Sequence, residues 1–318
     1  MKRIIGIIAV VIVLFLGVGI ALNRDSFEPP NQTANANIPD VDLSFAVLGD
    51  IHENIDSFQD AIDDMHAINP GLNALVLNGD TVDQGLVKQY DSIKKTIEKN
   101  KSLLPSTLIK NIGNHEFFNY DIKENSPEDV QTFINRYLEF AGEEKVYHDT
   151  WLKGYHFISL GSEDGNSATL DSVRAYISKE QQNWLRAKLA EKHEKGKPIF
   201  VYMHQTLNSN SSSGWVGSDQ GKELRDILSQ YPEVVLFTSH THRPLDETSI
   251  NTVNQPFTTV HTGAVHYTIV TDGKGGRTLE PQVNGLYIEV KGNQVVIRGR
   301  DMKNHSWVFN KEILKEQK

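Results

Sequence analysis

The sequence predicts an α/β fold with a largely parallel sheet, and three observations support this prediction. Short apolar runs of 4 to 6 residues, the length of a buried strand, recur along the chain. Amphipathic patterns of helical period lie between successive runs, and this alternation is typical of parallel sheets. Hydrophobic residues make up 38% of the 318 residues, which is enough to form a full core.

Six buried strands and two helices follow from this pattern. Asn54–Ile68 places its apolar residues on one helical face, and Glu180–His193 does the same around Trp184, Leu185 and Leu189. The expected strands, in chain order, are Leu43–Leu48, Ala74–Leu77, Leu108–Ile112, Tyr155–Leu160, Ile199–Met203 and Val234–Phe237.

Two segments near the C-terminus also have strand character. Leu286–Val290 and Val295–Ile297 flank Lys291-Gly292-Asn293, which predicts an antiparallel hairpin. A longer strand-like run, Phe257–Val270, carries His261 and His266.

The N-terminus has the pattern of an export or anchoring segment. An uncharged apolar run, Ile4–Leu22, follows Lys2 and Arg3 and is long enough to cross a bilayer as a helix. Gly19-Ile20-Ala21 is compatible with signal cleavage, so residues 1–22 are interpreted as a signal anchor or a signal peptide. The positive-inside rule leaves the two basic residues in the cytoplasm. We therefore expect an extracytoplasmic, membrane-anchored protein, or a secreted one after cleavage.

The remainder divides into a linker and one folded domain. Residues 23–42 are polar, contain prolines and lack apolar periodicity, which predicts an extended linker before a domain at 43–318. The chain has no cysteine, so disulfides, iron–sulfur clusters and cysteine nucleophiles are excluded. Its net charge of -9 argues against a stable nucleic-acid partner.

Potential metal ligands follow five of the six predicted strands. Ligand sites in open α/β sheets lie beyond the carboxyl ends of the strands, so we expect these side chains to converge. Members of the i,i+2 pairs Asp50/His52 and His240/His242 would point to the same side of an extended chain. The full set, in strand order, is Asp50 and His52, Asp80 and Asp83, Asn114 and His115, His204, and His240 and His242.

The chemistry of this set favours two divalent ions. Imidazole nitrogens with carboxylate and amide oxygens suit zinc, manganese or iron. Without Asp83 and His115, 7 ligands remain, which are too many for one tetrahedral ion and suit two. Two divalent cations held by two carboxylates leave a positive local charge that attracts a phosphate and activates a water. A single Gly-Asp after a strand is usually structural, so the ordered combination carries the prediction.

The ordered motifs resemble the signature of the calcineurin-like metallophosphoesterases. The matching segments are Gly49-Asp50-x-His52, Gly79-Asp80-x-x-Asp83, Gly113-Asn114-His115-Glu116, His204 and His240-x-His242. The resemblance implies a four-layer α/β/β/α sandwich and a metal-dependent phosphoesterase acting on a phosphate-ester substrate.

The resemblance also implies roles for individual residues. Asp80 would bridge the two ions, and His115 would stabilise the transition state or protonate the leaving oxygen, with Asp83 orienting it by a hydrogen bond. One ion would take Asp50, His52, Asp80 and His242, and the other would take Asp80, Asn114, His204 and His240.

Three residues depart from the family pattern without removing a ligand. Glu53 and Ser239 stand where the family often has glycine. Gln84 stands where members that act on phosphoproteins carry an arginine, and its presence counts against a Ser/Thr protein phosphatase because arginine supplies a bidentate phosphate clamp.

Several functions remain open at this point. The first is hydrolysis of phosphomonoesters or phosphodiesters. The second is a cyclic-nucleotide phosphodiesterase or nuclease on the same site. A third, of another class, is a non-catalytic surface metal-binding module, although binding alone would not require His115.

Other residues give weaker signals. Trp215, after the polar segment Asn208–Ser213, is interpreted either as part of a lid or as surface loop. His261 either supports a ligand or is an ordinary histidine. The histidines without a motif partner are interpreted as structural: His66, His148, His156, His193 and His305.

Overall fold

The computed structural model describes residues 40–207, 218–253, 255–272 and 274–313, which belong to one compact unit. The predicted anchor or signal segment (1–22), the linker as far as residue 39 and the loop with Trp215 lie outside the described residues. Within the described ranges, no helix has the length and apolar character needed to span a membrane.

Two mixed sheets form the centre of this unit, where composition and patterning alone predicted one largely parallel sheet. In the first sheet β1 pairs in parallel with β2, and β2 with β3, while β12, β13 and β14 extend it with antiparallel pairs. Its order is β14 (Ser306–Ile313), β13 (Gln294–Asp301), β12 (Asn284–Lys291), β1 (Leu43–Leu48), β2 (Ala74–Asn78) and β3 (Thr107–Asn111).

The second sheet is parallel at its centre and antiparallel at both edges. A separate two-stranded ribbon joins β10 (Thr268–Thr271) and β11 (Arg277–Glu280). The order of the second sheet is β4 (His148–Leu152), β5 (Tyr155–Ser159), β6 (Ile199–Tyr202), β7 (Val234–Thr238), β9 (Thr258–His261) and β8 (Ile250–Asn251).

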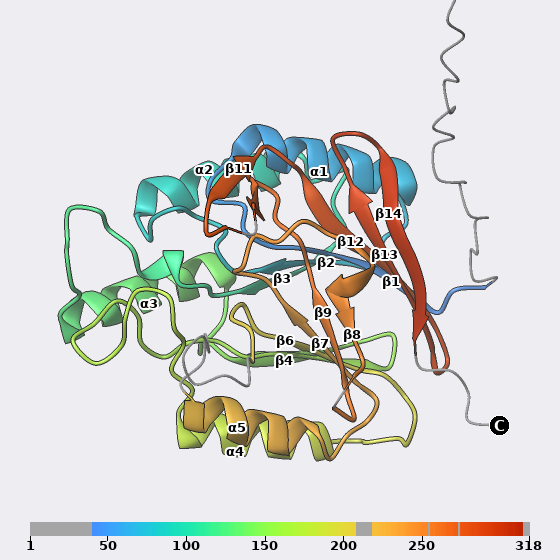
Figure 1. Ribbon diagram of the computed structural model, residues 1–318. Helices are drawn as coiled ribbons and strands as arrows, with labels where there is room; N and C mark the ends of the chain where they lie inside the picture. The colour runs from blue at the N-terminus through green and yellow to red at the C-terminus, as the bar shows by residue number, and fades with distance from the viewer. Residues whose placement is uncertain (1–39, 208–217, 254, 273, 314–318) are drawn as a thin grey trace, which may run out of the picture. The chain divides into compact units, whose positions relative to one another are not determined.

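Helices cover the outer face of each sheet, which confirms the four-layer α/β/β/α arrangement (Figure 1). The first sheet packs against α1 (Ile55–Ile68), α2 (Val87–Lys99) and α3 (Pro127–Ala141). The second packs against α4 (Lys179–Ala190) and α5 (Ser218–Leu228). Two short 3-10 helices cover His115–Phe117 and Glu247–Ser249.

The alternation of side chains along the strands explains the layers. In β6, Phe200 and Tyr202 point into the core between the sheets, whereas Ile199 and Val201 point toward α4 and α5. Phe45 of β1 meets Phe200 edge-on, with ring centroids 4.9 Å apart, across this inner core. The carboxyl ends of parallel strands from both sheets therefore lie at one edge of the sandwich.

Most of the predicted elements are confirmed to within a few residues. The six strands, the C-terminal hairpin and both helices are present, and Asn54 caps α1 by accepting a hydrogen bond from Ser57 N at 3.0 Å. The prediction of one continuous strand-like run at Phe257–Val270 is wrong. Residues 262–267 divide it into β9 and β10, which belong to different sheets. The pattern did not predict β4, β8, β11, β14, α2, α3 or α5.

A buried ion pair joins α1 to the antiparallel part of the first sheet. Arg300 of β13 donates two hydrogen bonds to Asp64 of α1, from Nε and Nη2, each 2.8 Å long. His305 Nδ1 lies 2.6 Å from the same carboxylate. Because Asp64 is 3% exposed, loss of the guanidinium would leave a buried charge with one partner fewer.

We expect Arg300→Ala to lower the free energy of unfolding by about 3–5 kcal/mol, the usual cost of breaking a buried pair. Urea denaturation measures this loss. Arg174→Ala is the control, because Arg174 and Asp171 form an ion pair with side chains 44% and 47% exposed, and it should cost at most about 1 kcal/mol. Equal, small losses in both variants would show that the buried pair contributes no more than a surface pair.

Candidate metal centre

Five of the seven candidate ligands have left-handed backbone in the sharp turns that follow the strands. The expectation that the i,i+2 pairs lie in extended chain is wrong, because their backbones have positive φ: Asp50 (54°), His52 (48°), His240 (70°) and His242 (51°). Asp80 has the same conformation, with φ of 49°. Such backbone is strained for residues other than glycine, and it concentrates here at the edge where strands of both sheets end.

Two motif glycines are required by close packing. A Cβ on Gly113 would lie 2.2 Å from Asp80 Oδ1, and a Cβ on Gly79 would lie 2.5 Å from the ring of His204. Gly79 also has φ of +86°. These two glycines let the backbone of the first sheet approach the ligand side chains directly.

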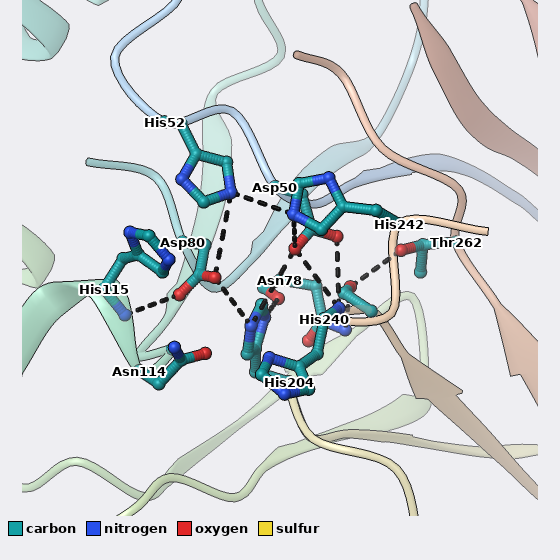
Figure 2. Close-up of polar contacts among 12 residues, drawn as sticks. Asp50, His52, Asn78, Asp80, Asn114, His115, His204, His240, His242 and Thr262 are labelled. Atoms are coloured by element: carbon teal, nitrogen blue, oxygen red, sulfur yellow. Dashed lines mark hydrogen bonds and ion pairs between the residues drawn. The ribbon is translucent and has the colours of Figure 1, made fainter. Parts of the chain in front are cut away.

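The structure brings the predicted ligands into clusters that share members. In the first cluster, His242 Nε2 lies 3.1 Å from His52 Nε2 and 3.3 Å from Asp50 Oδ1. The second contains Asp80, His204 and His240, and in it His204 Nε2 lies 3.0 Å from Asp80 Oδ2. Asp80 also lies 3.8 Å from His52 Nε2. Figure 2 shows Asp80 between the histidines of the two clusters.

Backbone carbonyls determine which ring nitrogens face the centre. His204 Nδ1 bonds to Asn78 O at 2.9 Å and His242 Nδ1 to Tyr267 O at 2.8 Å. A carbonyl only accepts, so each Nδ1 carries a proton, and each ring directs its Nε2 into the site. There His204 Nε2 meets a carboxylate oxygen, which is also an acceptor, so the arrangement requires a proton or a cation between them.

Asn114 provides a second indication of a cation. Its side-chain Nδ2 donates to Ser172 O at 3.1 Å, which directs Oδ1 the other way. That oxygen is buried and has no hydrogen-bond partner among the described residues. A buried amide oxygen without a partner is costly, and a bound divalent ion would satisfy it. The donor set of imidazole, carboxylate and amide therefore fits the two metals expected from the sequence.

The protein's own charges shift the titration of these groups in opposite directions. Burial disfavours the charged form of His204, but Asp80 outweighs this and raises the pKa of His204 to about 9. Burial and then the nearby charge of His204 lower the pKa of His240 to about 3. Burial also opposes ionisation of Asp80, but His204, His115 and His52 together outweigh it and hold the pKa of Asp80 well below its usual value. Asp80 therefore dominates the local field.

His115 forms a third cluster with His52 and Asp80, which joins the other two, and it is held by Asp83, although mainly through the main chain. His115 Nδ1 bonds to the carbonyl oxygen of Asp83 at 2.9 Å, while the Asp83 carboxylate lies 3.5 Å away. Burial would lower the pKa of His115, but Asp80 and Asp83 outweigh it and raise this pKa to about 9. The predicted partner of His115 is thus in contact with it, and Nε2 remains available on the side of the ring away from that carbonyl.

Glu116, for which the sequence predicted no role, connects two loops of the site. Its carboxylate is 1% exposed and accepts hydrogen bonds from the backbone N–H groups of Asp80 (3.0 Å), Thr81 (2.8 Å) and Gly113 (2.7 Å). Its place in the Gly-Asn-His-Glu segment was the available signal. Glu116 therefore ties the loop after β2 to the loop after β3.

Ser239, which stands where the family often has glycine, belongs to a buried polar chain between the sheets. Its Oγ accepts from Asn78 Nδ2 at 2.9 Å and lies 2.7 Å from Thr262 Oγ1. Asn78 Oδ1 in turn accepts from Asn111 Nδ2 at 2.9 Å. The chain thus runs from β3 and β2 of the first sheet to the ends of β7 and β9 of the second.

The remaining histidines lie outside the clusters. His261 is buried and its Nε2 bonds to Arg243 O at 3.1 Å, so it orders the segment after His242 without a direct contact to a candidate ligand. The others bond to protein groups elsewhere: His66 to Leu103 O, His148 to Lys110 O, His156 to Asp149, His193 to Glu233 and His305 to Asp64.

Comparisons with known proteins agree with this geometry. A family model for calcineurin-like phosphoesterases matches residues 43–244. A dimetal phosphatase from Danio rerio has a similar fold, with a TM-score of 0.57 and 13% identity over 86% of this chain and 99% of that chain. Purple acid phosphatase PPD1 from yellow lupin seeds gives a TM-score of 0.59 and 14% identity, over 86% and 54% of the two chains.

A third similar structure is GAP50, the anchor in the inner membrane complex of Plasmodium. It has a TM-score of 0.54 and 14% identity, over 87% of this chain and 90% of that chain. No curated protein matches the sequence significantly.

The chain belongs to the calcineurin-like phosphoesterase family. It is a metal-dependent phosphoester hydrolase, and members of this class work with two divalent metal ions. The candidate ligand clusters agree with that requirement.

Metal binding should stabilise the fold, because the ions bind only the assembled clusters. We expect Mn²⁺ or Zn²⁺ added to chelator-treated protein to raise its melting temperature. Each bound ion should add about 2.7 kcal/mol to the free energy of unfolding when the free metal is at 100-fold excess over its Kd. Asp80→Asn should lose most of this increment, because an amide supplies no negative charge to either cluster. Differential scanning calorimetry measures the increment independently of turnover.

Asp149→Asn is the matched control, because Asp149 pairs with His156 at 2.9 Å in an Asp–His contact outside the clusters. Its metal-induced increment should equal that of the wild type. An undiminished increment in Asp80→Asn would rule out the shared role of Asp80.

Proposed function

We propose that this enzyme hydrolyses phosphomonoester or phosphodiester bonds with His115 as the acid that protonates the leaving oxygen. The observation that carries the proposal is the contact between His115 Nδ1 and the carbonyl oxygen of Asp83. This contact leaves Nε2 as the ring atom that can carry a proton toward a substrate. His115 belongs to neither proposed set of four ligands.

Seven residues would hold the two ions in this proposal, with Asp80 shared. The sets are Asp50, His52, Asp80 and His242 for one ion, and Asp80, Asn114, His204 and His240 for the other. Manganese, iron and zinc all suit the mixed nitrogen and oxygen ligands. When bound, the ions supply positive charge for the phosphoryl oxygens and lower the pKa of a water.

The contribution of the protein is orientation. Carbonyl oxygens fix the rings of His204 and His242, Ser172 fixes Asn114, and Glu116 fixes the backbone of Asp80. A substrate phosphate held there would have its leaving oxygen on the side of His115. Asp83 is a positioning residue in this proposal, because it acts on the substrate through His115.

Replacing His115 should separate chemistry from metal binding. We expect His115→Ala to retain two metal ions per chain by elemental analysis and to lose about 10²–10⁴-fold in rate on an alkyl phosphate ester. The loss should shrink on a 4-nitrophenyl ester, since nitrophenolate departs without a proton. Equal losses on both esters would instead assign His115 to charge stabilisation, and full activity on both would contradict the site assignment.

We also propose that the enzyme works outside the cytoplasm, held by the apolar segment Ile4–Leu22. The length of this segment supports a retained anchor over a cleaved signal peptide, and the basic residues before it support the orientation.

Membrane fractionation tests this location. Full-length protein should sediment with membranes and resist extraction by high salt, because apolar insertion is insensitive to ionic screening. Soluble protein in the medium that begins near Leu22 would establish cleavage instead.

A further inference from the structure

An aromatic rim borders the candidate metal centre on the side of His115 and His52. It consists of Phe118 and Tyr120, which follow β3, and His266 and Tyr267, which lie between β9 and β10. The Phe118 ring lies 4.3 Å from that of His115 and 6.2 Å from that of Tyr120. On the other side, Tyr267 stacks on His242 at 4.3 Å, and His266 lies 5.9 Å from His52. Rings from two separate loops therefore lie beside the histidines of the same site.

Tyr120 is unusual in this rim because it is both exposed and held in place. Its side chain is 63% exposed, although large aromatic rings are normally buried. Its hydroxyl nevertheless donates to Asp83 Oδ1 at 3.0 Å, and its backbone N–H donates to Gln84 Oε1 at 2.9 Å. Both anchors are residues of the loop that follows β2. An exposed ring fixed in advance loses little entropy when a second ring stacks on it.

The contacts of Gln84 indicate which kind of group the rim would bind. It occupies the position at which an arginine would clamp a phosphate, and here its side-chain oxygen accepts the Tyr120 N–H instead. Its own backbone N–H donates to Gln89 Oε1 at 2.6 Å. The Gln84 side chain therefore holds an aromatic residue at the rim. In the arginine-bearing relatives, the residue at this position would hold an anion.

We propose that Tyr120 and Phe118 form a stacking platform for a planar ring carried by the leaving group, with Gln84 as a positioning residue. The proposal rests on the proposed function, since His115 defines the side on which the leaving group departs. It assigns the substrate class to phosphate esters of nucleosides or aryl alcohols, in preference to esters of open-chain or sugar alcohols. Stacking of a base on an aromatic side chain would supply the preference.

Inhibition constants test this preference for either a monoesterase or a diesterase. The reporter is whichever of 4-nitrophenyl phosphate and bis(4-nitrophenyl) phosphate the metal-loaded enzyme hydrolyses. AMP and ribose 5-phosphate are compared as inhibitors, because they share the phosphate and the sugar and differ only in the adenine ring. We expect AMP to bind about 5- to 100-fold more tightly, the range given by one stacked base. Phenyl phosphate against propyl phosphate distinguishes an aryl preference from a nucleoside preference.

Variants assign the preference to the platform. Tyr120→Ala should reduce the AMP advantage, the ratio of the two inhibition constants, to about 2-fold or less, because a change in phosphate binding affects both inhibitors equally and cancels in the ratio. Tyr120→Phe keeps the ring and should keep most of the advantage, although it removes the bond to Asp83. Tyr176→Ala is the control, since Tyr176 is 42% exposed on the segment between β5 and α4. It should change neither constant.

The outcomes separate this proposal from the one on which it rests. A wild-type enzyme that hydrolyses a reporter but binds both members of each pair equally well overturns the stacking platform alone. The platform is also overturned if Tyr120→Ala keeps the full AMP advantage. An enzyme that hydrolyses neither reporter with manganese, iron or zinc overturns the proposed function and this inference with it.

Discussion

The position of the Asp80 carboxylate is the constraint on which the candidate metal centre depends. Oδ1 accepts the backbone N–H of His115 at 2.8 Å, and Oδ2 faces His204 at 3.0 Å. Asp80 thereby joins a loop of the first sheet to a loop of the second. Burial opposes the charged form of both histidines, but the charge of Asp80, together with nearby hydrogen bonds and the other carboxylates, raises both of their pKa values. Glu116 accepts a hydrogen bond from the backbone N–H of Asp80, and Gly113 leaves the space that the Asp80 carboxylate fills.

This arrangement requires the two sheets to keep a fixed offset, and the buried polar chain beneath the site supplies one. Asn111, Asn78, Ser239 and Thr262 satisfy one another in sequence across the layer between the sheets. A shift of one sheet would leave several of these groups buried without partners, which is costly in an apolar surrounding. Apolar contacts such as Phe45 with Phe200 tolerate small displacements better, because they lack direction. The hydrogen bonds of Ser239 therefore help to fix the position of one sheet relative to the other, which explains its presence here.

The sequence was sufficient for the strand ends and for the polar side chains that follow them, because both are local signals. Asp50, Asp80, Asn114, His204 and His240 each follow an apolar run, and parallel strands bring their ends together. Local signals could not reveal how the ends turn: the left-handed backbone at Asp50 and His240 replaces the expected extended chain. They also missed contacts between distant segments, such as Asn114 with Ser172 and Glu116 with Asp80.

The break between β9 and β10 escaped prediction for a related reason. Residues 257–270 are apolar enough for one strand, but the chain turns away so that Tyr267 O can accept from His242 Nδ1 and Ile269 N can donate to His242 O. The contacts that fix the His242 imidazole therefore take precedence over the strand pattern of residues 257–270. A histidine partner 25 residues away carries no signature in the run itself.

Substrate choice must depend on parts of the chain other than the ligands, since the motif ligands are shared across the family. In this chain the loop after β2 supplies Asp83 and Gln84, and both hold Tyr120 as well as bordering the site. The Asp83 carboxylate also lies 3.6 Å from His52 Nδ1 and 3.5 Å from His115 Nδ1. A leaving group that displaced Tyr120 would disturb a group in contact with both histidines, whereas one that stacked on Tyr120 would leave it in place. In the proposed reaction, recognition of the leaving group and orientation of His115 would therefore be coupled through Asp83.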